Sequence, residues 1–181
     1  PGSRAPAPTR RRADADAAVA PGWIAAHRAA LAETDAVAGR IETFEEEARR
    51  LPAAFHRRRL REERYLGLTL AFEALMDPEG RADGVNLAGG ANLGFRAAAY
   101  RAAGGFARRE SDEDRELIAR MRARGFRTRV CETAVVRASL RAQGRAPAGM
   151  AGGVAARLAG LDTADSALRP LDEMLARRLP A

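Results

Sequence analysis

Residues 89–96 read Gly-Gly-Ala-Asn-Leu-Gly-Phe-Arg, residues 104–106 read Gly-Gly-Phe, and residues 111–125 read Ser-Asp-Glu-Asp-Arg-Glu-Leu-Ile-Ala-Arg-Met-Arg-Ala-Arg-Gly. The glycine pairs favour turns, because glycine lets the backbone turn tightly and approach other groups closely. Between these turns, residues 97–103 predict a short helix. The third segment predicts a helix over 112–124, which Gly125 ends in a left-handed conformation.

The sequence on either side of this stretch alternates between helix and strand patterns. Pro21 suits the first turn of a helix that runs to about Glu33, because its missing amide hydrogen is not needed there. The other expected elements are a strand over 35–41, one or two amphipathic helices over 55–76, strands over 126–130 and 134–136, and a helical tail after residue 146. Strands interspersed with helices predict the α/β class.

Length and composition bound the class of protein. The 181 residues are enough for one domain, and a hydrophobic fraction of 46% is typical of a globular chain. Cys131 is the only cysteine, which excludes an intrachain disulfide and a cysteine-based zinc cluster. No apolar run is long enough for a membrane span, and residues 1–12 lack the apolar stretch of a secretory signal. We therefore expect a cytoplasmic protein without a transmembrane segment.

The chain is basic, with a net charge of +7 and a pI near 11.1. Such a charge attracts nucleic acids and anionic membranes. All the basic side chains are arginines, and most are dispersed among acidic residues, as on a solvated surface. Residues 10–12 and 57–64 are the exceptions, where a local anion-binding face is the alternative. We expect no nucleic-acid partner, because no aromatic stacking pattern accompanies the charge.

Asp14 and Asp16 are separated by one residue. In an extended segment the side chains at i and i+2 project to the same face, so that two carboxylates meet. Carboxylate oxygens suit a hard divalent cation such as Mg or Mn, which a protein shares with the phosphates of its substrate. The alternative is a solvated turn whose charges favour a nearby helix N-terminus.

Glu113 and Asp114 open the charged helix. A carboxylate at this point can accept the proton of a hydroxyl group that acts as a nucleophile. The alternative is structural, because Ser111 and Asp114 are spaced almost as in a capping box and acidic residues stabilise a first helical turn. The two roles are compatible, since a cap fixes the carboxylate where catalysis needs it.

Together these segments resemble the acceptor half of a family 2 glycosyltransferase. The resemblance rests on the order of an Asp-x-Asp motif, Pro21-Gly22-Trp23, a Gly-Gly-x-Asn loop, a Gly-Gly-Phe turn and a Glu-Asp helix. It implies a partial GT-A fold, which is Rossmann-like, with a mixed sheet and flanking helices. It also implies transfer of a sugar, with inversion, from a nucleotide-diphosphate sugar to an acceptor hydroxyl.

The resemblance also implies roles for particular residues. Asp14 and Asp16 would hold Mg or Mn and the donor diphosphate, and Asp114 would be the catalytic base. The acceptor would meet Gly89, Gly90, Asn92 and Glu113, and the donor phosphates would meet Arg137 and Arg141. Many relatives carry a histidine metal ligand at the place of Arg137. The metal is then left with the two aspartates and the phosphates, or Arg137 replaces metal charge by pairing with phosphate directly.

The resemblance covers residues 13 to about 150, and we predict a catalytic domain over 14–145 and a helical C-terminal tail over 146–181. Residues 1–13 are predicted to be a disordered arm, because they are rich in proline and arginine and lack apolar periodicity. The nucleotide-binding half of the family precedes the Asp-x-Asp motif, and we expect it to be missing from this chain. The alternatives are a truncated enzyme, a half that needs a complementing N-terminal half or forms a homo-oligomer, and a non-catalytic interaction module.

Overall fold

The computed structural model describes residues 8–75, 89–109, 112–144, 149–161 and 172. The chain forms two compact units, each built from two separate parts of the sequence. Unit 1 comprises Pro1–Phe44 and Asp83–Ser139, and unit 2 comprises Glu45–Ala82 and Leu140–Ala181. The domain expected over 14–145 is therefore interrupted by a segment of unit 2, which the sequence did not reveal because helical patterns occur in both units.

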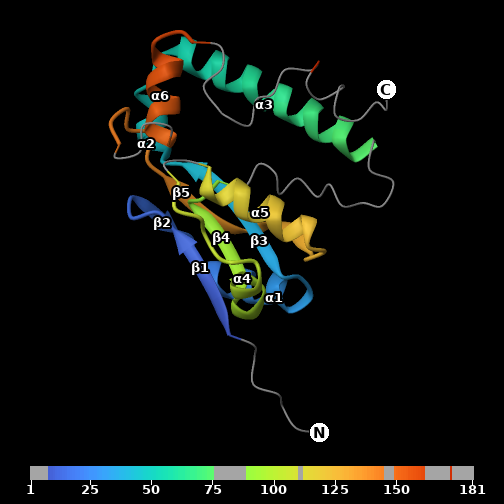
Figure 1. Ribbon diagram of the computed structural model, residues 1–181. Coiled ribbons are helices and arrows are strands. Elements are labelled where there is room, and N and C mark those ends of the chain that lie inside the picture. Colours follow the sequence, from blue (N-terminus) through green and yellow to red (C-terminus); the bar gives the residue numbers. More distant parts are fainter. Residues whose placement is uncertain (1–7, 76–88, 110–111, 145–148, 162–171, 173–181) are drawn as a thin grey trace, which may run out of the picture. The chain divides into compact units, whose positions relative to one another are not determined.

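Unit 1 contains a mixed sheet of five strands (Figure 1). In spatial order these are β1 (Thr9–Ala13), β4 (Asn92–Arg96), β3 (Ala36–Thr43), β5 (Thr128–Ala138) and β2 (Ala17–Val19). β3 and β5 run parallel, and the other neighbouring pairs are antiparallel. The expected α/β fold with a mixed sheet and flanking helices is thus confirmed.

Helices cover both faces of this sheet, because successive side chains of a strand point to opposite faces. On β3, Val37 packs against residues of α1 (Trp23–Glu33), whereas Ala36 and Ala38 pack on the opposite face. That opposite face is covered by α4 (Ala97–Ala102) and α5 (Glu113–Ala123). Its core contains Ala36, Ala38, Leu93, Phe95, Ala99, Ala103, Leu117, Ile118 and Met121.

The N-terminal arm predicted over residues 1–13 is wrong for residues 9–13, which form β1 at one edge of the sheet; residues 1–7 lie outside the described residues. Backbone pairing with β4 orders this strand without any apolar pattern. Its alternate arginines also find aromatic partners. The guanidinium carbon of Arg10 lies 5.3 Å from the ring centre of Tyr100, and that of Arg12 lies 5.0 Å from the ring centre of Phe106. Such cation–π contacts add modest stability.

β5 is a single strand where two shorter strands were expected. Its parallel pairing with β3 is irregular, because it passes from Gly39 opposite Cys131 to Arg40 opposite Val135. The residues between Cys131 and Val135 have no counterpart on β3. This irregularity explains why the apolar pattern of the sequence is interrupted between residues 130 and 134.

The described residues of unit 2 form three helices, α2 (Glu45–Arg49), α3 (Ala53–Leu75) and α6 (Met150–Leu158). Its core includes Phe55, Leu140 and Val154. Glu62, only 6% exposed, pairs with Arg157 of α6 through a hydrogen bond of 2.6 Å from the Arg157 Nε. The expected helix over 55–76 is thus one continuous helix, and it is tied to α6 by a buried charge pair.

The helices predicted in unit 1 are confirmed with small shifts at their ends. α1 begins at Trp23, just after Pro21, and Gly125 follows α5 with a φ of 79°. None of the helices in the described ranges combines the length and the apolar character that a membrane crossing requires. Of the predicted helical tail over 146–181, the structure describes residues 149–161 and 172, and the rest lies outside the described residues.

Candidate functional site

Two turns lie side by side at one end of β1 and β4. The strands are antiparallel and Ala13 pairs with Asn92, so the turn that follows β1 lies beside the turn that precedes β4. The first turn carries Asp14 and Asp16, both exposed. The second contains Gly90, and it is closed by a 3.1 Å hydrogen bond from the backbone amide of Asn92 to the carbonyl oxygen of Gly89.

The first turn of α5 reaches the same place. A Cβ atom placed on Gly90 would lie 2.9 Å from Oδ2 of Asp114 and 3.4 Å from the guanidinium carbon of Arg12. The first distance is shorter than an ordinary contact, so a side chain at residue 90 would displace the Asp114 carboxylate, whereas the second is an ordinary contact. The other carboxylate oxygen of Asp114, Oδ1, accepts a 2.7 Å hydrogen bond from the amide of Arg115. One oxygen of Asp114 is therefore held by the helix, and the other points to the space beside Gly90.

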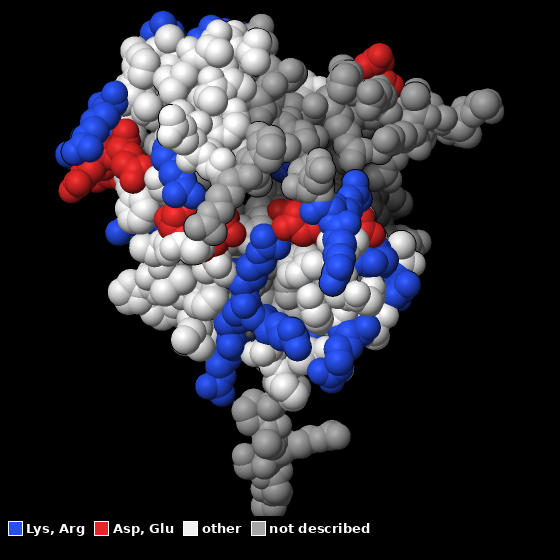
Figure 2. Space-filling view, turned by 60° about the vertical axis from the view of Figure 1, so that its left-hand side comes forward, with Lys and Arg blue, Asp and Glu red and all other residues white. Residues whose placement is uncertain are grey.

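Arg12 links the strand to the helix. Its Nη1 donates a 2.8 Å hydrogen bond to Oε1 of Glu113, and both side chains are partly exposed. In Figure 2, acidic side chains flank arginine side chains on this side of the molecule. Arg12 is a site residue that the sequence analysis did not assign, although residues 10–12 had been singled out as a possible anion-binding face. We call Arg12, Asp14, Asp16, Gly90, Glu113 and Asp114 the β1–α5 cluster.

The other charges of this cluster act on Asp14. Although Asp14 is exposed as a residue, partial desolvation of its carboxyl group raises the pKa of Asp14 above its ordinary value. Arg12 opposes this shift, whereas the negative charges of Asp16, Asp114 and Glu113 add to it. A carboxylate with a raised pKa carries negative charge at a cost in free energy, and a bound cation would relieve that cost.

Asp14 and Asp16 lie in a turn, which the Ala17 backbone amide closes by a 3.1 Å hydrogen bond to the carbonyl oxygen of Asp14, and not in the extended segment assumed from their spacing. Asp14 and Asp16 supply oxygen ligands only, which hard cations such as Mg and Mn accept. Among the described residues no three metal-ligating side chains come together as a ready-made site. Two carboxylates are nevertheless sufficient for Mg, which usually takes one or two of them and completes its shell with water and substrate phosphate.

Asn92, expected at the acceptor, is instead fully buried and used inside the fold. Its Oδ1 accepts hydrogen bonds from Nε1 of Trp23 at 2.8 Å and from Nε2 of His27 at 3.0 Å. Its Nδ2 donates to the carbonyl oxygens of Arg40 at 2.8 Å and Ala134 at 2.7 Å. The last two residues border the irregularity between β3 and β5. Asn92 therefore holds the turn that contains Gly90 in place rather than facing solvent.

His27 has a defined tautomer in this network. Because the Asn92 amide nitrogen faces two carbonyl groups, its oxygen must accept, and Nε2 of His27 must carry the hydrogen. Nδ1 is buried without a hydrogen-bond partner, and it points at Gly94, where a Cβ atom would lie 2.4 Å away. Burial lowers the pKa of His27; the Asn92 hydrogen bond opposes this shift, and the charge of Arg11 adds to it.

The two arginines expected at the donor phosphates lie in different units. Arg137 is exposed on β5, opposite Ala18 of β2, and its Nε lies 3.7 Å from Oε2 of Glu42. Arg137 therefore lies on the strand that pairs with β2, and β2 follows directly after the turn that carries Asp14 and Asp16. Arg141 belongs to unit 2 and is exposed. Only Arg137 thus shares the unit of the β1–α5 cluster.

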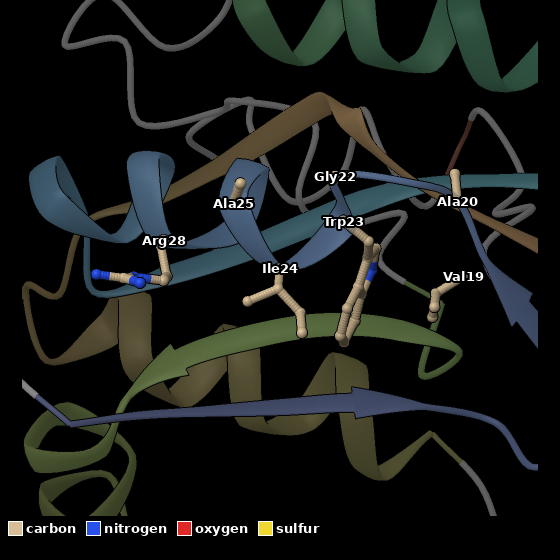
Figure 3. A pocket seen from close by; sticks show the side chains of 7 residues that line it. All are labelled: Val19, Ala20, Gly22, Trp23, Ile24, Ala25 and Arg28. Carbon is tan, nitrogen blue, oxygen red and sulfur yellow. The ribbon is translucent and has the colours of Figure 1, made fainter.

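A shallow hollow of about 360 Å³ lies elsewhere, beside β2 and the start of α1. Figure 3 shows the side chains that line it, from Val19, Ala20, Gly22, Trp23, Ile24, Ala25 and Arg28. Its wall is apolar except for Arg28, and Val19 and Ile24 are half-exposed. The hollow contains none of the acidic residues of the β1–α5 cluster. Its size does not make it the chemical centre, because it offers no acid, base or nucleophile.

Comparison with protein-family models and with curated protein sequences finds no significant match to this chain.

Proposed function

We propose that this chain is the acceptor half of a family 2 glycosyltransferase, with a partial GT-A fold. It takes part in transfer of a sugar from a nucleotide-diphosphate sugar to an acceptor hydroxyl, with inversion. One observation carries the proposal: the Asp114 carboxylate, on the distant α5, and the Arg12 guanidinium, at the end of β1, both lie against Gly90, and the negative charge of Asp114 helps to raise the pKa of Asp14. The roles that the resemblance in sequence assigns to these residues require them to lie near one another. The composition of the chain alone does not require it.

Asp114 is the general base in this proposal. Its Oδ2 lies beside Gly90, while the Arg115 amide fixes its Oδ1 and with it the orientation of the carboxylate. The acceptor hydroxyl oxygen attacks the anomeric carbon as Asp114 takes its proton. The nucleotide diphosphate leaves with the electron pair of the broken carbon–oxygen bond, and attack from the opposite side inverts the configuration.

The other residues of the β1–α5 cluster position the two substrates. Asp14 and Asp16 would hold the cation, which when bound supplies positive charge to the leaving diphosphate. Arg12 orients Glu113 through their ion pair, and Glu113 lies beside the base on the acceptor side. Gly90 leaves the space that the acceptor enters. Arg137 is the arginine of unit 1 that would meet a donor phosphate.

The test uses a chimera in which the nucleotide-binding half of a family 2 enzyme precedes residue 8. Transfer is measured by mass spectrometry with a panel of nucleotide-diphosphate sugars, Mn and simple sugar acceptors, and donor affinity is measured by calorimetry. Asp114→Asn should lower the transfer rate by at least about 100-fold, because a general base is lost, while the donor affinity stays nearly unchanged.

Asp112→Asn is the matched control, because it removes a carboxylate two residues away and asparagine tolerates the φ of 58° found there. This variant should keep transferring. Equal loss in the two variants would assign Asp114 to the helix start alone. A chimera that binds donor tightly and transfers nothing would favour the non-catalytic interaction module.

A further inference from the structure

One side of α3 is exposed along nearly its whole length. Residues spaced alternately four and three apart share a helix face, because an α-helix has 3.6 residues per turn. On α3 this spacing defines the α3 stripe, which consists of Arg57, Arg61, Arg64, Leu68, Ala71 and Leu75. All six are exposed, and Leu68 and Leu75 keep 70% and 82% of their surface in solvent. Leu60, beside the stripe, is 49% exposed.

The opposite side of α3 is committed to unit 2. Phe55 is buried in the core of that unit, and Glu62 is paired with Arg157 of α6. Glu63 points away from the stripe and pairs with Arg59 over 2.7 Å. The α3 stripe itself contains no acidic residue. It is therefore a one-sided surface with three positive charges at its start and two leucines toward its end.

We propose that the α3 stripe binds an anionic membrane surface. A helix that lies in the bilayer interface buries apolar side chains at the boundary of the acyl chains and keeps basic side chains at the level of the lipid phosphates. The α3 stripe offers both kinds of side chain on one face, with the leucine end placed to insert more deeply than the arginine end. This inference does not depend on the proposed sugar transfer.

Charge complementarity favours this occupant over the alternatives. A second copy of α3 packed in parallel would bring three arginines against three arginines, and an antiparallel copy would bury them against leucines. A nucleic acid would satisfy the arginines but leave Leu68 and Leu75 in water. An anionic bilayer satisfies both halves of the stripe. The arginine-rich segment 57–64 thereby receives a role that the β1–α5 cluster does not give it.

The experiment is co-sedimentation of the 181-residue chain with phosphatidylcholine vesicles that contain or lack phosphatidylglycerol. We expect binding to the anionic vesicles that weakens with salt. The triple variant Arg57→Gln, Arg61→Gln, Arg64→Gln should bind about 100-fold less tightly, since each basic side chain near an anionic surface contributes roughly five-fold. Leu68→Ser with Leu75→Ser should weaken binding by at least about ten-fold, because the apolar contact is lost.

A matched control separates the stripe from net charge. Arg101→Gln, Arg108→Gln, Arg109→Gln removes the same charge from exposed positions of unit 1, and it should bind nearly as tightly as the parent chain. Circular dichroism and the unfolding midpoint establish that every variant is folded. Equal loss in the two triple variants, or no binding to anionic vesicles at low salt, overturns the proposal. Binding of RNA or an acidic peptide through the stripe, without vesicle binding, also overturns it.

Discussion

Arg12 and Glu113 form a 2.8 Å ion pair although 101 residues separate them in the sequence. The pair joins the end of the edge strand β1 to the first turn of α5. Asp114 follows Glu113 directly. A partly exposed ion pair contributes little to stability. Its effect is geometric, because it fixes the direction in which the first turn of α5 presents its two carboxylates.

Replacing Arg12 with glutamine tests this link. We expect Arg12→Gln to lower the free energy of unfolding by about 1 kcal/mol, because it removes a partly exposed ion pair and a contact with the Phe106 ring. Arg10→Gln is the matched control, since it removes only the contact with the Tyr100 ring. Urea denaturation measures both variants. A loss of several kcal/mol for Arg12→Gln would mean that Arg12 supports the core rather than the site.

Gly90→Ala should impair the site and spare the fold. The φ of Gly90 is not in the left-handed region, so alanine can adopt its backbone, but the added Cβ would lie 2.9 Å from Asp114 Oδ2. We expect transfer by the chimera to fall by at least about ten-fold, because the base and the acceptor are displaced. The unfolding midpoint should change little. Normal transfer by Gly90→Ala would show that the acceptor does not enter beside this residue.

Gly67→Ala should act in the opposite way. Gly67 lies inside α3, and a Cβ atom there would meet nothing within 4 Å. Glycine in an exposed helix interior costs about 1 kcal/mol relative to alanine, so the variant should be more stable by about that amount. Thermal unfolding measures the gain. Transfer by the chimera should be unaffected, since Gly67 belongs to unit 2.

Asn92→Ala should be strongly destabilising. It leaves the Arg40 and Ala134 carbonyl groups without their donor, and the Trp23 and His27 donors without their acceptor, all in a buried site. We expect the free energy of unfolding to fall by about 3–5 kcal/mol, measured by urea denaturation. A loss below about 1 kcal/mol would contradict the buried network and return Asn92 to the acceptor.

The stability of the chain should depend on the protonation of His27. Its pKa in the folded state lies below the ordinary 6.5, so the unfolded chain binds the proton more readily. The free energy that this group contributes is complete above pH 6.5 and is lost as the pH falls through the lowered value. Between about pH 5 and 7 the free energy of unfolding should therefore rise less steeply with pH in His27→Gln than in the parent chain. Urea denaturation at a series of pH values measures both.

The 181-residue chain alone should bind nucleotide-diphosphate sugars weakly. Under the proposed function its site groups would meet metal, phosphate and acceptor, whereas the base and ribose would be held by the nucleotide-binding half of the family that it resembles. The open edge of β1 and the exposed Val19 and Ile24 should also favour self-association. Calorimetry with Mn and light scattering test both expectations. Tight donor binding by a monomer would contradict this expectation.

Much of the fold could be predicted because neighbouring residues in the sequence determine where most of its helices begin and end. Pro21, Gly104 and Gly125 mark helix boundaries through their own backbone preferences, and the helices lie close to where these residues predict them. β1 could not be predicted in this way. Its three successive arginines carry no strand pattern, and its order comes from pairing with β4, which lies about 80 residues later in the chain.

The same distinction holds for the candidate site. The spacing of Asp14 and Asp16 and the Glu113–Asp114 pair are visible in the sequence, so the acidic members could be proposed from it. The ion pair of Arg12 could not be predicted, because its partner Glu113 is 101 residues away in the sequence. Asn92 was assigned to a ligand because an exposed and a buried asparagine look alike in sequence. The hydrogen bonds that Asn92 makes in the folded chain distinguish the two.

The hydrogen bonds of Asn92 have a consequence for how this chain tolerates change. They join Trp23, His27 and Arg40, from the first part of unit 1, to Asn92 and Ala134, from the second part. The stretch between the two parts, Glu45–Ala82, is thereby released from holding them together. Changes in that stretch should therefore affect unit 2, which α3 helps to build, while strand pairing and the buried Asn92 side chain keep the two parts of the sheet together.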